Sequence, residues 1–299
     1  MVIHHVQIGT ADLYALQIWP VQQLPAADVL RTHDEAALAA HHARHPALSH
    51  RGGTLLNFTL HAFLIRHAGR TLLVDTGEPV TRNGAVLDWG LAALGVTPDD
   101  IDLVFLTHRD DDHVGGVLTP GGQPRFPRAR YLMARHEAEG FRADPGRADQ
   151  WRTTLGPLQD AGRLDLLDDG AEISPGLTTL PTPGHRPGAT SLYLQDGGHS
   201  ALLLADTLHV PLQVTHPDWS SVWDADPDQA AHTRTDVLTR AETQGGLLAV
   251  PHIPGAFGTV HRDSASGPLQ WAPAGAVLTP AEPQPSVLAP GRVDHTGSG

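Results

Sequence analysis

Apolar residues run together or alternate with polar ones in short segments from residue 54 onward, a pattern typical of β-strands. The segment TLLNFTLHAFLIR (54–66) is rich in apolar and β-branched residues, and RTLLVDTG (70–77) follows the turn at 67–69. This arrangement predicts a β-hairpin that ends in an Asp-Thr-Gly loop. The next segment, TPDDIDLVFLTH (97–108), predicts a turn and then a continuously apolar strand, which indicates burial on both faces.

Strands and helices alternate along much of the remaining chain, although strands also occur in runs. Apolar spacing and flanking caps predict helices over 83–95, 134–142, 148–161 and 227–244. The last of these begins at Asp226-Pro227, a capping residue followed by proline at the first helical position. Short apolar segments predict further strands over 129–134, 163–168, 176–182, 190–195, 200–206 and 247–251. The predicted class is mixed α/β, with at least two layers of sheet.

The two ends of the chain depart from this pattern. Residues 1–50 are mixed, with one short helix predicted over 32–47, whose many histidines we expect on a solvated face. From residue 273 the chain is rich in Pro, Ala and Gly, which predicts a flexible tail over 273–299. We therefore expect a single domain over 1–272, in which 1–50 is an N-terminal extension packed on the rest.

Composition and charge exclude several classes of protein. The 299 residues are 40% hydrophobic and 18% charged, which is typical of a globular chain. A formal net charge of −13 argues against a nucleic-acid-binding surface. No segment approaches the ~18 continuous apolar residues of a membrane span, so no membrane partner is expected. The N-terminus lacks the features of an export signal, so we expect a cytoplasmic location.

Histidine is abundant and cysteine is absent, with 20 and 0 residues respectively. The absence of cysteine excludes disulfides, thiolate metal sites and a cysteine nucleophile. Any metal ion must therefore be held by His, Asp or Glu.

The segment LTHRDDDHVGG (106–116) is the one most indicative of chemistry. His108, Asp110, Asp112 and His113 follow directly after the predicted buried strand. Residues two apart in an extended segment point the same way, and a turn brings the next pair toward the same side. Neutral His and Asp are natural ligands for Zn, Fe or Mn. A solvated acidic loop is the alternative reading of this segment alone.

Three further residues of the same types stand at the ends of predicted strands. His185 lies in a Pro- and Gly-rich loop (TPGHRPG), Asp206 ends LLLAD, and His252 follows LLAVP. Burial of an ionisable group at the end of an apolar strand is unfavourable unless the group is paired or coordinated. The three residues therefore favour a metal site over a solvated loop.

Together these motifs resemble those of the metallo-β-lactamase-fold hydrolase superfamily. The matching motifs are LVDTG with Asp75, THRDDDHVGG, TPGH, LADT and VPH, and they extend over residues 54–255. The resemblance implies an αββα four-layer sandwich with two divalent metal ions at one end of the sheets. It implies no cofactor-binding residues beyond the metal ligands.

The resemblance also assigns the ligands. It implies that the first metal ion is held by His108, Asp110 and His185, and that the second is held by Asp112, His113 and His252. Asp206 would bridge the two ions, and Asp75 would brace the loops of the site. The implied reaction is hydrolysis by a metal-bridging hydroxide, in which Asp112 is also the catalytic residue that orients the nucleophile.

One position departs from the family pattern H-x-H-x-D-H, because Asp110 stands in place of the second histidine. A carboxylate is a harder, anionic ligand, which shifts preference from Zn toward Fe or Mn. We expect zinc first, and the carboxylate of Asp110 makes iron or manganese the alternatives.

Several residues near the motifs remain open in role. His209 follows Asp206 by three residues and is expected to be a partly exposed polar side chain rather than part of the site. The segment around His216, with Trp219 and Trp223, either walls a substrate pocket or contributes only packing. Arg186, beside His185, is a less favoured contact for an anionic substrate. The apolar N-terminal stretch 15–24 covers either a pocket or a partner subunit.

The layout of the chain is similar to the lactonase and organophosphate-hydrolase branch of the superfamily. We therefore predict hydrolysis of a small-molecule ester or lactone, with an acyl-homoserine lactone as one candidate and phosphotriesters as a promiscuous activity. The alternatives are a thioesterase or β-lactamase of the same fold, or a non-catalytic metal-dependent binding or sensing protein. A homodimer is left open.

Overall fold

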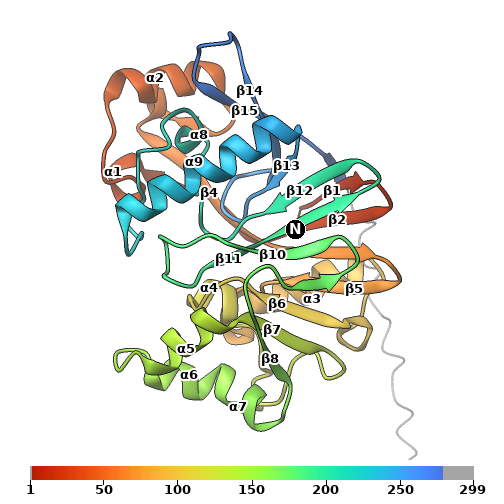
Figure 1. Ribbon diagram of the computed structural model, residues 1–299. Helices are drawn as coiled ribbons and strands as arrows, with labels where there is room; N and C mark the ends of the chain where they lie inside the picture. The colour runs from red at the N-terminus through yellow and green to blue at the C-terminus, as the bar shows by residue number, and fades with distance from the viewer. Residues whose placement is uncertain (1, 279–299) are drawn as a thin grey trace, which may run out of the picture.

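Both faces of the central strands are apolar, so the sheets must be covered on both sides. In β4 (Leu55–His67), Phe63 and Ile65 belong to one hydrophobic cluster and Ala62 and Leu64 to another, and all four are buried. In the computed structural model, which describes residues 2–278, one face of the sheet packs on a second sheet and the other on helices (Figure 1). The αββα four-layer sandwich that the resemblance implied is confirmed.

The first sheet contains the predicted hairpin and the strands that follow it. It places β5 to β8 side by side in parallel, whereas β1, β2, β4 and β5 pair in antiparallel order. Its strands in spatial order are β16 (Ala276–Leu278), β1 (Ile3–Ile8), β2 (Ala11–Pro25), β4, β5 (Arg70–Val74), β6 (Leu103–Leu106), β7 (Arg130–Ala134) and β8 (Leu164–Leu167), and β3 (Ser49–His50) pairs with β4.

The second sheet is antiparallel except for one pair, β12 with β13, which runs parallel. Its strands in spatial order are β15 (Leu269–Pro273), β14 (Phe257–Arg262), β13 (Leu247–Ala249), β12 (His199–Leu203), β11 (Thr190–Asp196), β10 (Leu177–Pro181) and β9 (Glu172–Ser174). Leu192, Leu194 and Leu203 of this sheet pack against Phe63 and Phe105 of the first and form the core between the sheets.

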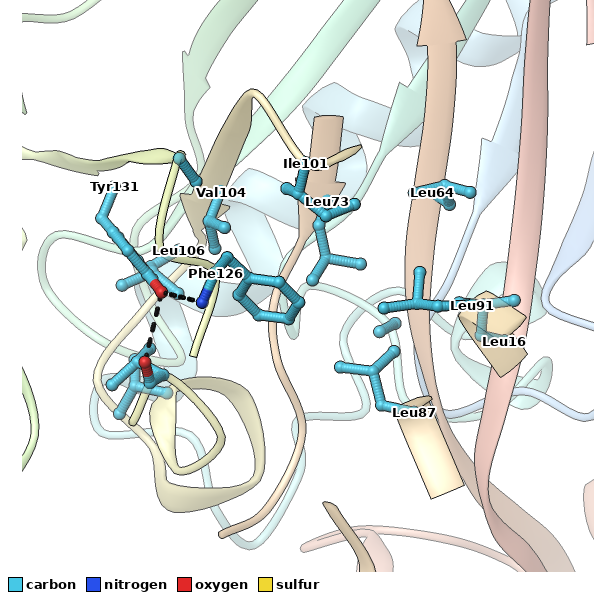
Figure 2. Close-up of a cluster of buried hydrophobic side chains, with 14 of the residues drawn as sticks. Leu16, Leu64, Leu73, Leu87, Leu91, Ile101, Val104, Leu106, Phe126 and Tyr131 are labelled. Atoms are coloured by element: carbon cyan, nitrogen blue, oxygen red, sulfur yellow. Dashed lines mark hydrogen bonds between the residues drawn. The ribbon is translucent and has the colours of Figure 1, made fainter. Parts of the chain in front are cut away.

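Helices cover the outer faces of both sheets. On the first sheet, Leu87 and Leu91 of α3 pack against Leu64 and Leu73 (Figure 2). On the second sheet, α9 packs through Val237, Leu238 and Ala241. The α-helices are α1 (Ala26–Val29), α2 (Glu35–Arg44), α3 (Ala85–Ala93), α4 (Asp111–Val114), α5 (Arg135–Ala143), α6 (Ala148–Thr153), α7 (Leu155–Asp160), α8 (Leu212–Thr215) and α9 (Pro227–Gln244), with helical turns η1 (Arg51–Gly53), η2 (Val80–Gly84) and η3 (Pro98–Asp100).

The N-terminal segment is an integral part of the first sheet. The sequence predicted mixed structure over 1–50, but β1 and the long strand β2 pair with each other and with β4. The helix predicted over 32–47 is confirmed as α2, with the Asp34 side chain accepting a hydrogen bond from the Ala37 N–H at its start.

Two predicted boundaries differ from the structure. The helix predicted over 148–161 is divided into α6 and α7, because Thr154 has non-ideal φ/ψ and Pro157 lacks an N–H to continue the α-helical ladder. The tail predicted over 273–299 begins too early, since Pro273 ends β15 and residues 276–278 pair with β1 as β16. Residues 279–299 of that tail lie outside the described residues.

No helix in residues 2–278 is both long and apolar enough to cross a bilayer. The predicted single-domain division of the chain and its predicted lack of nucleic-acid and membrane partners stay predictions.

One histidine of α2 is buried, contrary to the solvated face expected from the sequence. His41 is 8% exposed, and its ring lies 5.1 Å from that of His45. Burial, together with the neighbouring His45 and His42, lowers the pKa of His41 from 6.5 to about 4.

We predict that this histidine destabilises the fold in acid. Because the unfolded chain binds the proton at pH 6.5 and the folded chain only near pH 4, stability falls as the pH drops between these values, by on the order of 3 kcal/mol. His41→Gln should remove this part of the pH dependence, measured by urea unfolding at pH 7 and pH 4.5. The exposed His33→Gln is the matched control, and equal pH dependence in both variants would contradict the prediction.

Candidate metal centre

Strand ends from both sheets meet at one edge of the sandwich, where their last residues change from apolar to ionisable. Asp75 follows β5 and His108 follows its parallel neighbour β6, while Asp206 follows β12 and His252 follows its parallel neighbour β13. His185 lies on the connection between β10 and β11. Carboxyl ends of adjacent parallel strands lie at the same edge, which is where open α/β sheets bind ligands.

Asp206 lies at the middle of this cluster, where the Nε2 atoms of the four histidines predicted as ligands, and that of His209, converge on its carboxylate. The distances to its oxygens are 3.1 Å from His252, 3.4 Å from His113, 3.5 Å from His185 and 3.8 Å from His108. Asp206 and the four histidines are all buried. A buried anion with five imidazole nitrogen atoms around it is the electrostatic centre of the site.

His113 and His108 are oriented by one buried carboxylate, that of Asp75. The His113 Nδ1–H donates to Asp75 Oδ2 at 2.7 Å. The Thr107 hydroxyl also donates to Asp75, so it accepts from His108 Nδ1, which lies 3.0 Å away. Both rings therefore present Nε2 to the site. The bracing role that the resemblance implied for Asp75 matches these contacts.

The other two histidines are oriented in the same way by different partners. The His252 Nδ1–H donates to the Thr59 carbonyl at 2.8 Å, and that of His185 donates to Asp224 at 3.2 Å. Asp224 is in turn held by the buried Arg234, at 3.3 Å. Each Nε2 atom is thus left as a free acceptor directed into the cluster when the ring is neutral.

The donor atoms fit divalent metal ions. Among the described residues, the buried Nε2 atoms of His108 and His113 and the Oδ1 atom of Asp206 have no hydrogen-bond partner. Unsatisfied buried polar atoms are unfavourable, and a metal ion satisfies them. In the described part of the chain, three groups have ligand atoms within 4.8 Å of one another: His108, His185 and Asp206; Asp112, His113 and His252; and His185, His209 and Asp224.

Asp110, which stands where the family motif has a histidine, faces both the histidines of the first group and two arginines. Its Oδ2 lies 3.2 Å from His185 Nε2 and 3.7 Å from His108 Nε2, near enough to join the first group. However, Arg186 binds both of its oxygens, and Arg147 lies 3.7 Å from Oδ1. The sequence left a substrate contact as a less favoured role for Arg186 and did not indicate this pairing.

In two histidines of the cluster, neighbouring carboxylates outweigh burial and raise the pKa. Although burial opposes protonation, the charges of Asp206 and Asp112 raise the pKa of His113 well above its usual value. Burial also lowers the pKa of His185, but its hydrogen bonds, with Asp110 first, raise that pKa to about 9. Protons on these rings compensate the carboxylates, and a metal ion would displace them.

His209 belongs to the cluster, contrary to the partial exposure expected from the sequence. It is fully buried, its Nε2 lies 3.4 Å from Asp206 Oδ2, and its ring lies parallel to that of His252 with centroids 5.6 Å apart. Burial lowers the pKa of His209. Its position three residues after Asp206 was the available signal.

A pocket of about 360 Å³ lies over the cluster. Its floor includes Asp110, Asp112 and Asp206, and its walls include residues from distant segments: Trp19, Gln22 and Leu24 of β2, Phe58 of β4, and Trp223. The N-terminal stretch therefore covers the pocket. Of the aromatic segment near residue 220, Trp223 lines it, whereas His216 stacks on Trp219 with ring centroids 4.2 Å apart.

Comparison with known proteins agrees with this geometry. A family model described as the metallo-beta-lactamase superfamily matches residues 59–253. Hydroxyacylglutathione hydrolase of Aeromonas salmonicida is 34% identical over 149 residues, which are 49% of this chain and 45% of the relative. N-acyl homoserine lactonase of Bacillus thuringiensis is 25% identical over 173 residues, 51% of this chain and 64% of the relative. The chain thus spans about half to two thirds of the length of these curated relatives.

Solved structures with the same fold extend over nearly the whole chain. Hydrolase AbOPH of the beta lactamase superfamily superposes with a TM-score of 0.80 at 23% identity, covering 92% of this chain and 98% of that one. AidC, a dizinc quorum-quenching lactonase in complex with its product, superposes with a TM-score of 0.77 at 20% identity and the same coverage. At these identities the likeness establishes the fold.

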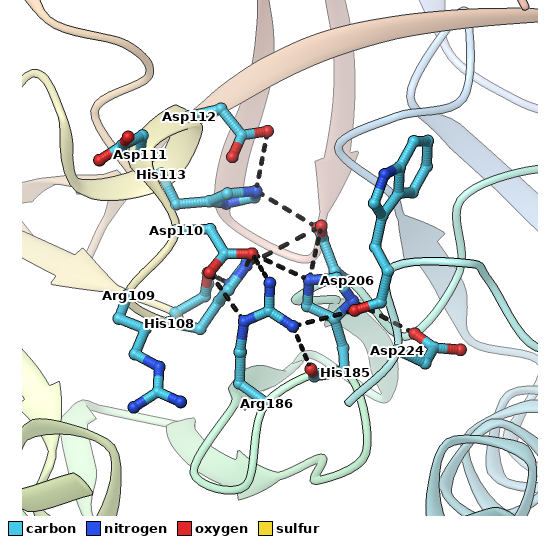
Figure 3. Close-up of polar contacts among 12 residues, drawn as sticks. His108, Arg109, Asp110, Asp111, Asp112, His113, His185, Arg186, Asp206 and Asp224 are labelled. Carbon is cyan, nitrogen blue, oxygen red and sulfur yellow. Dashed lines mark hydrogen bonds and ion pairs between the residues drawn. The ribbon is translucent and has the colours of Figure 1, made fainter. Parts of the chain in front are cut away.

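We predict that Asp206→Asn lowers metal affinity by more than about 100-fold, because the variant removes the one anion near all four imidazoles. Asp111→Asn is the matched control from the same motif. Asp111 points away from the cluster (Figure 3), and its Oδ1 accepts a hydrogen bond from Gln150. Metal analysis of both variants after dialysis checks this expectation, and equal metal content would contradict it.

Proposed function

Because the chain belongs to the metallo-beta-lactamase superfamily of hydrolases, we propose that it uses two divalent metal ions to hydrolyse a small ester or lactone. The observation that carries the proposal is the pair of ligand groups around Asp206 at the floor of an apolar-walled pocket. His108, His185 and Asp110 would hold one ion, with Asp206 shared. Asp112, His113 and His252 would hold the other. Zinc is the first choice, with iron or manganese as alternatives.

Bound metal ions of this kind lower the pKa of water to about 7 and so supply hydroxide at neutral pH. The protein provides the carboxylate that orients this nucleophile. Asp112 lines the pocket floor, with Oδ2 3.6 Å from His113 Nε2 and 3.8 Å from His252 Nε2. It is half-buried, so it can accept a proton from the attacking water while it faces the substrate.

The pocket walls favour a substrate with an apolar group beside its carbonyl. Phe58 stacks on His252 with ring centroids 4.5 Å apart, and Trp223 lies 5.5 Å from both Phe58 and His209. These rings form an apolar surface next to the charged floor, which suits an acyl chain above a reacting ester. The dizinc lactonase neighbour with a bound product supports the lactone class. Phosphotriesters would be a promiscuous substrate class.

Thioester hydrolysis is the second candidate, supported by the likeness to hydroxyacylglutathione hydrolase. A panel of lactones, aryl esters, thioesters, phosphotriesters and β-lactams, run on metal-loaded protein, separates the classes. Turnover of lactones or esters above the other classes supports the proposal. Metal binding without turnover of any class would instead support a binding or sensing protein.

We predict that Asp112→Asn lowers kcat/KM by at least about 100-fold on the best substrate, because the amide neither accepts the proton nor carries the charge. Metal content must be measured on the same sample, so that a lost ion is separated from a lost proton acceptor. Asp111→Asn is the neighbouring control for a lost charge, and because Asp111 also lines the pocket, its kcat rather than its KM is compared. Unchanged turnover in Asp112→Asn would contradict the assigned role.

We predict that Trp223→Ala weakens binding rather than chemistry. Loss of an apolar wall should raise KM several-fold for long-chain acyl substrates and less for short ones, with kcat changed little. Steady-state kinetics over a series of acyl lengths measures this difference. A change in kcat that is equal for all lengths would show that Trp223 acts on the reacting centre instead.

A further inference from the structure

We propose that the two metal sites bind their ions unequally, because Arg186 competes with one ion for the carboxylate of Asp110. This inference rests on the proposed function, in which both ligand groups take up a metal ion. It concerns a residue that the ligand assignment leaves out. Arg186 would be a positioning residue that sets the affinity of the first site.

The contact between Arg186 and Asp110 uses both oxygens of the carboxylate (Figure 3). Arg186 Nε donates to Oδ1 at 2.8 Å, and Nη2 donates to Oδ2. The guanidinium is also held by the backbone, because its Nη1 donates to the carbonyls of His185 and Trp223 at 2.6 and 2.9 Å. The backbone therefore holds Arg186 in this place.

The same carboxylate faces the imidazoles of the first site. Asp110 Oδ2 lies 3.2 Å from His185 Nε2 and 3.7 Å from His108 Nε2. Paired, charge-assisted hydrogen bonds from arginine to a carboxylate are among the strongest in proteins. A metal ion at this site would therefore have to displace or share the guanidinium, and Arg147, 3.7 Å from Oδ1, adds a second positive charge.

The second site contains no such competitor. Within residues 2–278, the ion pairs of Asp112 are those with His113 and His252, and no arginine pairs with it. Asp206 is common to both sites, so it does not distinguish them. The two sites therefore differ in their second carboxylate. Asp110 of the first site is paired with arginine and Asp112 of the second is not, so the site containing Asp112 fills first.

Zinc titration of metal-stripped protein against a chromophoric chelator tests this. The wild-type protein should show two binding events whose dissociation constants differ by about tenfold or more. Arg186→Gln should tighten the weaker event by about tenfold and leave the tighter event unchanged. Arg147→Gln, which removes a longer contact with the same carboxylate, is the matched control, with an expected change under about threefold.

Asp110→Asn tests the same inference without altering the arginine. It removes the contested ligand and leaves Arg186 beside the site, so the weaker binding event should be lost and the tighter one kept. Two equal events in the wild-type protein would overturn the inference while leaving the proposed function intact. It would also be overturned if Arg186→Gln left the weaker event unchanged, whatever the effect of Asp110→Asn. Binding of no zinc at all would overturn the proposed function as well.

Discussion

One buried carboxylate, that of Asp206, sets the requirements that the rest of the site meets. An isolated anion in a dry interior is strongly unfavourable, and here five imidazole nitrogen atoms lie within 3.8 Å of it. The rings of His108, His113, His185 and His252 face Asp206 because each is fixed through its opposite nitrogen. The cluster is therefore held in place by hydrogen bonds one layer further out, with Asp75 and Asp224 as their charged members.

The fold supplies this arrangement through close packing at loops rather than through the strands alone. Gly184, just before His185, has a φ of +133°, and a Cβ atom there would lie 2.4 Å from the backbone of Ala230 in α9. The loop carrying His185 is thus seated directly on the first turns of α9. The same helix contributes Arg234, which holds Asp224 behind His185. The position of α9 therefore determines the orientation of the His185 ring.

The sequence predicted most strands between residues 54 and 251, because strand ends and ligand types are local features, but it did not predict β1, β9, β14 or β15. The hairpin of β4 and β5 and the helices α3 and α9 follow from patterns within about twenty residues. Other features depend on contacts between distant segments, which a single sequence does not show. Arg186 was separated from its true partner Asp110 by 76 positions, and the burial of His209 is set by rings from three other segments. Strand β2 was missed because proline and glutamines interrupt its apolar pattern.

The walls of the pocket and its floor come from different parts of the chain. The segment matched by the family model begins at residue 59, whereas Trp19, Gln22 and Leu24 lie before it, on β2. The floor that carries the ligand groups and this portion of the wall therefore lie on separate segments of the chain. Substitution of the Trp19, Gln22 and Leu24 side chains would reshape the pocket, whereas the backbone of β2 must stay in place, because the Trp19 carbonyl accepts from Thr59, which orients His252. Residues 11–25 are accordingly the natural starting point for redesign of selectivity.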